Sequence, residues 1–164
     1  MRKGYASLPL RLSEHVRLHD RVNEFRAAFR EVVRNATRGL ATSAVLESTE
    51  ERDLLIVPQQ REKGFEFRLE CFDYGVYPTA AGWRGGCWDV TVYTADNLRE
   101  ALDAFLKSLL NDAVLEVRLS NARPYKWILH YCFDGARVAD ETGRVLFNWF
   151  GRRSTERFSN GPAT

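Results

Sequence analysis

The amino-acid sequence predicts an α+β fold, with a largely antiparallel sheet of about five or six strands, a long N-terminal helix and a second helix packed on the sheet. Apolar residues near the N-terminus recur at helical spacing, several later segments alternate apolar and polar residues, and short turn segments connect most of them. The 164 residues are 45% hydrophobic and 12% aromatic, which is enough to bury a core. We therefore expect a single domain over residues 1–164.

The first element is a helix predicted over residues 12–38. Its apolar residues fall on one helical face, at steps of three and four: Leu18, Val22, Phe25, Phe29, Val32 and Ala36. Gly39 then provides a stop. The other side carries an arginine row at i, i+4 spacing: Arg26, Arg30, Arg34 and Arg38. Like charges at this spacing repel, so the row either faces an anion or pairs with Glu24, Glu31 or the acidic cluster in residues 47–53.

The sheet is predicted within residues 54–158. Apolar patterns bounded by turn residues indicate strands at residues 54–57, 65–71, 88–93, 114–119, 125–133, 144–150 and 152–158. A second helix is predicted over residues 96–110, with Thr94 or Asp96 as its N-cap. Residues 73–87 contain Pro78 and four glycines, which predicts a loop or a broken strand.

Charge is distributed unevenly along the chain, although the net charge is only +2. Residues 1–40 carry nine basic and four acidic side chains, residues 41–151 carry twelve and seventeen, and residues 152–164 carry three and one. A basic N-terminal segment therefore precedes an acidic central segment. Such asymmetry influences the choice of partner more than the fold.

The sequence contains no motif that predicts catalysis or the binding of a cofactor or metal. His15 and His19 are four residues apart without an obvious third ligand, so we interpret them as part of a solvated helix face. Cys71, Cys87 and Cys132 form no C-x-x-C pair, and we expect buried, reduced thiols. We therefore predict that the protein is not an enzyme. An enzyme assembled around the 73–89 loop is one alternative.

Loop aromatics and nearby acids are the candidate partner-binding residues. Rigid rings anchor protein interfaces, and acidic side chains steer a basic partner. The candidates are Asp73, Tyr74, Tyr77, Trp83, Asp134, Asp140 and Glu141. The rings have the alternative role of core residues. The arginine row suggests a further alternative, a nucleic-acid-associated protein that uses the N-terminal helix, although the acidic central segment makes nucleic acid the less expected partner.

No apolar run approaches the roughly 20 residues of a membrane helix, and the N-terminus lacks the apolar stretch of a signal peptide. We therefore expect no membrane association and a cytoplasmic location.

The segment from Gly143 to Ser154, GRVLFNWFGRRS, follows a strand-helix unit and two hairpin-like strands. In this C-terminal half the chain resembles bacterial immunity proteins of contact-dependent growth inhibition. The resemblance implies a small cytoplasmic protein of a toxin–antitoxin pair, without enzymatic activity or a cofactor, that binds one cognate toxin domain and covers its active site. Such toxin domains are often nucleases, and the acidic central segment suits their basic clefts. The basic N-terminal helix departs from the acidic character expected of a nuclease inhibitor.

Overall fold

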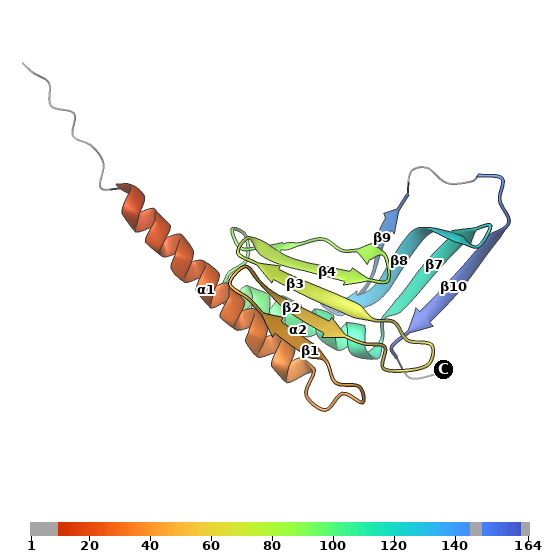
Figure 1. The fold of residues 1–164 in the computed structure, drawn as a ribbon, viewed down its shortest axis with the longest axis horizontal. Helices are drawn as coiled ribbons and strands as arrows, with labels where there is room; N and C mark the ends of the chain where they lie inside the picture. The colour runs from red at the N-terminus through yellow and green to blue at the C-terminus, as the bar shows by residue number, and fades with distance from the viewer. Residues whose placement is uncertain (1–9, 145–148, 162–164) are drawn as a thin grey trace, which may run out of the picture.

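The computed structural model describes residues 10–144 and 149–161, and within them the α+β class is confirmed (Figure 1). Helix α1 spans Leu10–Ala36 and helix α2 spans Ala95–Asn111. The strands form two antiparallel sheets, one of six strands and one of four, where the sequence suggested a single sheet. Helix α1 ends two residues before the predicted boundary. The chain turns there, and Gly39 has a φ of 83°, which favours glycine.

The six-stranded sheet is built in the order β1-β2-β3-β4-β5, with β6 also paired to β4. Its strands are β1 (Val45–Ser48), β2 (Arg52–Val57), β3 (Phe67–Phe72), β4 (Gly75–Ala80), β5 (Trp83–Arg84) and β6 (Trp88–Asp89). The strand predicted at 88–93 is shorter in the structure, where β6 ends at Asp89. The Asp89 carboxylate accepts the Thr91 backbone N–H at 2.7 Å and turns the chain. Thr94 then caps α2 by accepting the Asn97 N–H.

The four-stranded sheet has the order β10-β7-β8-β9. Its strands are β7 (Val114–Ser120), β8 (Arg123–Phe133), β9 (Ala136–Gly143) and β10 (Arg153–Ser159). Strand β9 occupies residues that the sequence pattern indicated as a link between two predicted strands. It pairs with β8 because Asp134 and Gly135 both adopt positive φ angles and form a tight hairpin turn. Of the strand predicted at 144–150, residues 145–148 lie outside the described residues, and Trp149 and Phe150 form a turn.

Helix α2 lies at the centre of the core. Its buried face contains Leu98, Leu102, Phe105, Leu106 and Leu109. Phe105 makes edge-on ring contacts both with Trp88 of β6 and with Tyr131 of β8, so the helix joins the two sheets. The C-terminal part of α1 packs beside α2, while its N-terminal turns project beyond the sheets (Figure 1). No helix in the described part of the chain is long and apolar enough to cross a membrane.

Candidate functional site

A buried carboxylate connects α1 to the six-stranded sheet. Asp53 of β2 points into the interior and is fully buried, and its oxygens accept hydrogen bonds from Nε of Arg26 and Nε of Arg30, each at 3.0 Å. Burial alone would raise the pKa of Asp53, but hydrogen bonds from Ser48, Arg26 and Arg30 hold it below its ordinary value. Asp53 is therefore ionised at neutral pH, and it pairs with two of the four arginines in the row.

Arg26 also fixes two surface turns. Its Nη1 and Nη2 donate to the backbone carbonyls of Glu50 and Thr49, each at 2.7 Å, and Nη1 lies 3.4 Å from a carboxylate oxygen of Asp73. Residues 49–51 connect β1 to β2, and residues 73–74 connect β3 to β4, so one planar guanidinium holds both turns at the same end of the sheet.

These turns carry exposed carboxylates beside a cluster of aromatic rings. We call this surface the turn patch: Glu50, Glu51, Phe72, Asp73, Tyr74 and Tyr77. The rings of Phe72 and Tyr74 are stacked with centroids 5.2 Å apart, and Tyr77 meets both rings edge-on. Tyr74 is 56% exposed. Neither α1 nor α2 covers this outer face of the sheet, so the rings are available to a partner.

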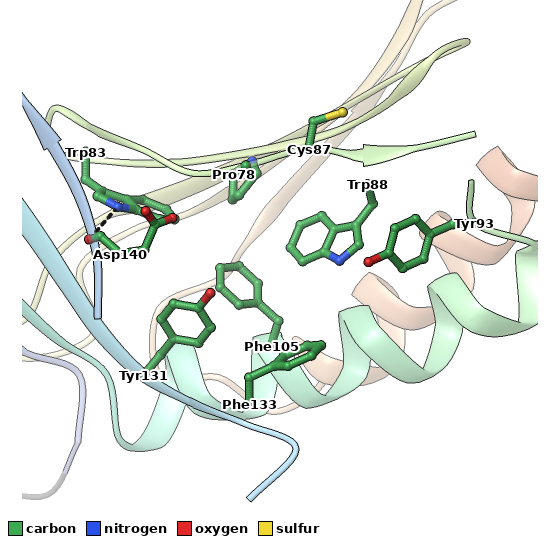
Figure 2. Close-up of a pocket in the computed structure, with 10 residues that line it drawn as sticks. Pro78, Trp83, Cys87, Trp88, Tyr93, Phe105, Tyr131, Phe133 and Asp140 are labelled. Carbon is green, nitrogen blue, oxygen red and sulfur yellow. Dashed lines mark hydrogen bonds between the residues drawn. The ribbon is translucent and has the colours of Figure 1, made fainter. Parts of the chain in front are cut away.

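Tyr77 links the turn patch to a pocket between the two sheets. A hydrogen bond between Tyr77 and the Cys87 side chain raises the pKa of Tyr77 to about 12. Cys87 is exposed, in contrast to our expectation of a buried thiol, and it lines the pocket. The pocket encloses about 240 Å³, and we call it the aromatic pocket (Figure 2). Its rings are Trp83, Trp88, Tyr93, Phe105, Tyr131 and Phe133.

The predicted partner-binding residues fall into three places. Asp73, Tyr74 and Tyr77 come together in the turn patch. Trp83 is only 1% exposed, and its indole N–H donates to the backbone carbonyl of Asp140 at 3.1 Å on one side of the aromatic pocket (Figure 2).

The third place is the β8–β9 hairpin, which carries the predicted residues Asp134 and Glu141. Asp134 is exposed at its tip, and Glu141 lies on the far side of the four-stranded sheet, where it pairs with Lys126 at 2.5 Å. Sequence reasoning did not select Glu50, Glu51 or Phe72, although the first two belong to the recognised acidic cluster.

Basic side chains gather on the four-stranded sheet as well as on helix α1, where the sequence predicted them. In the arginine row, Arg26 and Arg30 bind Asp53, whereas Arg34 and Arg38 border a shallow surface hollow. The outer face of the four-stranded sheet is basic, although three of its four strands belong to the segment counted as acidic. Its charged residues are Arg118, Lys126, Arg137, Arg153 and Arg157, with Glu116 and Glu141.

Glu116 on this face is almost fully buried between two arginines. Its carboxylate accepts hydrogen bonds from Arg118 at 2.9 Å and from Arg157 at 3.1 Å. The Arg118 hydrogen bond is the largest cause that lowers the pKa of Glu116, with a further contribution from Arg157. The two guanidinium groups are thereby held in fixed positions on the outer face.

The carboxylates that would serve an enzyme in the 73–89 loop have other partners. Asp73 contacts Arg26, and Asp89 accepts hydrogen bonds from Thr91. Among the side chains that the structure describes, no three His, Cys, Asp or Glu residues are grouped to hold a metal ion.

Comparison of the chain with protein-family models, with curated proteins and with solved structures gives no match in any of the three. The geometry of the site is therefore the basis for assigning a function.

Proposed function

We propose that the protein is a non-enzymatic inhibitor of the immunity type, which binds a cognate toxin domain through the turn patch. The observation that carries this proposal is the set of three exposed carboxylates, on Glu50, Glu51 and Asp73, around a cluster of partly exposed rings. The resemblance of the C-terminal half of the chain to bacterial immunity proteins indicates the class of partner.

The chemistry of the turn patch suits a basic partner surface. Exposed aromatic rings bury a large apolar area with little loss of side-chain entropy, and they commonly dominate interface energies. The carboxylates attract a positively charged surface and raise the association rate. A nuclease cleft that binds phosphates is such a surface, and an inhibitor with carboxylates in place of phosphates excludes the nucleic acid.

Rigidity also supports binding by the turn patch. The side chain of Arg26 is only 9% exposed, and its guanidinium contacts both turns in the absence of a partner. A preorganised surface loses less conformational entropy on binding than a mobile loop. The proposed interface therefore lies on a fixed scaffold formed by two strand turns.

Co-expression with the protein encoded immediately upstream tests the proposal. We expect co-purification and relief of that protein's toxicity. Tyr74→Ala should weaken binding at least about tenfold. Val45→Ala is the matched control, because Val45 is 47% exposed and lies at the end of β1 opposite the β1–β2 turn. Failure to co-purify, or equal binding by the two variants, contradicts the proposal.

A nucleic-acid-associated protein is the second candidate, and the basic outer face of the four-stranded sheet favours it. In this hypothesis the sheet face replaces the N-terminal helix as the binding surface, because Arg26 and Arg30 of the helix are paired with Asp53. Fluorescence anisotropy with a single-stranded oligonucleotide at several salt concentrations tests it. Binding that weakens with salt and is reduced by Arg137→Gln, but not by Arg34→Gln, supports the sheet face. Absence of binding at low salt rejects it.

A further inference from the structure

The residues that line the aromatic pocket favour a positively charged ligand. The lining combines six aromatic residues with Pro78, Gly86 and Cys87, and Asp140 is the single charged residue among the lining residues that the structure describes. Figure 2 shows the rings of Tyr131, Phe105, Trp88 and Tyr93 in a row across the pocket, with Asp140 beside Trp83 at the end opposite Tyr93. Arginine and lysine are absent from this described lining.

Phe105 packs edge-on between Trp88 and Tyr131, and the lining rings that keep some exposure are Trp88, Tyr93, Tyr131 and Phe133. Trp88 and Phe105 meet at 65° with centroids 5.1 Å apart, and Phe105 and Tyr131 meet at 89° at the same separation. An aromatic face carries negative electrostatic potential, so it attracts a cation. The Asp140 carboxylate adds a full negative charge. It also contributes to the raised pKa of Tyr131, after burial, which is the larger cause.

We propose that the aromatic pocket binds a small organic cation with a methylated ammonium group. The volume of about 240 Å³ lies below the range of about 300–1,000 Å³ that is typical of sites for drug-sized ligands, so the ligand is small. An anion is repelled by Asp140. This inference goes beyond the proposed inhibition of a toxin, because it concerns a different surface and does not require the partner protein.

Methylation of the ammonium group follows from the aromatic character of most of the wall, in which six of the ten lining residues carry rings. The rings of the pocket offer apolar contact, which suits methyl groups around a diffuse positive charge. The cation is either a free molecule such as choline or a trimethylated lysine side chain of a peptide, since both present the same group.

The fold allows the charge of Asp140 to be removed without disturbing its structural contact. The Trp83 indole N–H donates to the backbone carbonyl of Asp140, which Asp140→Asn retains. Glu141→Gln is the matched control, because it also removes one negative charge but acts on the far side of the same strand, beside Lys126. The two variants therefore separate a local effect in the pocket from a change in net charge.

Isothermal titration calorimetry on the purified full-length chain tests the proposal, with choline, a trimethyl-lysine peptide and 3,3-dimethylbutanol, the neutral analogue of choline. We expect at least one of the two cations to bind and the neutral analogue to bind about tenfold more weakly or not at all. Asp140→Asn should weaken cation binding about tenfold, and Glu141→Gln should leave it unchanged. Preference for choline or for the peptide identifies the source of the ammonium group.

Two results would overturn the proposal. One is that neither cation binds at millimolar concentration. The other is that the neutral alcohol binds as tightly as the cation, or that the Asp140→Asn variant binds the cation as tightly as the parent chain does. The partner protein is not present in this experiment, so its outcome is independent of toxin binding. Conversely, a failure of co-purification leaves the titration result intact.

Discussion

Replacing Arg26 by methionine should lower the free energy of unfolding by about 3 kcal/mol at neutral pH. Arg26 is 9% exposed and donates to Asp53 and to the carbonyls of Thr49 and Glu50. Removal of one partner from a buried ion pair typically costs about 3–5 kcal/mol. The lower end applies here because Asp53 retains hydrogen bonds from Arg30 and Ser48. With a urea dependence of about 2 kcal/mol per M, the midpoint of unfolding should fall by about 1.5 M.

Arg30→Met is the matched control. Arg30 donates one hydrogen bond to the same carboxylate, but its side chain is 36% exposed, so solvent screens the interaction and the expected loss is about 1 kcal/mol. Urea unfolding followed by circular dichroism measures both variants. If Arg26→Met lies within about 1 kcal/mol of the parent protein, or matches Arg30→Met, the reasoning about the buried clamp is refuted.

The effect of Arg26 should also depend on pH. The pKa of Asp53 is lower in the folded protein than its ordinary value of 3.8, so its contribution to stability is fully present above that value. The contribution is lost as the pH falls through the lower folded pKa, where Asp53 takes up a proton. The difference between the parent protein and Arg26→Met should therefore shrink in acid, and an unchanged difference would contradict the assignment.

Three further predictions concern the core and the second sheet. Burial raises the pKa of the Cys71 thiol from 9.0 to about 12, so stability should fall by up to about 4 kcal/mol as the pH rises from 9 to 12, and Cys71→Ala should remove that part of the slope in urea unfolding. Gly82→Ala should cost about 3 kcal/mol, because Gly82 has a φ of 116° and an added Cβ would lie 2.7 Å from the Trp127 ring, whereas Gly86→Ala, with open space around it, should be nearly neutral in thermal unfolding. Glu116→Gln should cost about 1 kcal/mol at neutral pH, and since the pKa of Glu116 is lowered, the difference from the parent should disappear in acid.

Periodicity predicted both helices and most strands whose apolar side chains face the core, but not β4, because Pro78 and the nearby glycines indicated a loop or a broken strand. In β3, for example, buried Phe67, Leu69 and Cys71 alternate with more exposed residues, as the sequence indicates. Strand β9 was not predicted because it is largely polar and exposed, so its pairing with β8 is visible only in three dimensions. The division into two sheets arises because, among the described strands, none of β1–β6 pairs with any of β7–β10, and strand patterns do not reveal which strands pair.

The candidate site was predictable only where it is local in sequence. Asp73, Tyr74 and Tyr77 lie within one short segment, and composition was enough to select them. Arg26 and Asp53 are separated by 27 residues, so no spacing rule joins them. The aromatic pocket draws on two sheets and a helix, and its rings were therefore assigned to separate strands and loops.

The way in which Arg26 holds the β1–β2 turn determines how the turn patch can change during evolution. The guanidinium binds the carbonyl oxygens of Thr49 and Glu50, which every amino acid supplies, rather than their side chains. Substitutions at positions 50 and 51 can therefore alter the charge and shape offered to a partner while the turn keeps its anchor. A chain built in this way can follow a rapidly diverging partner by changing surface side chains alone, and its core can stay constant.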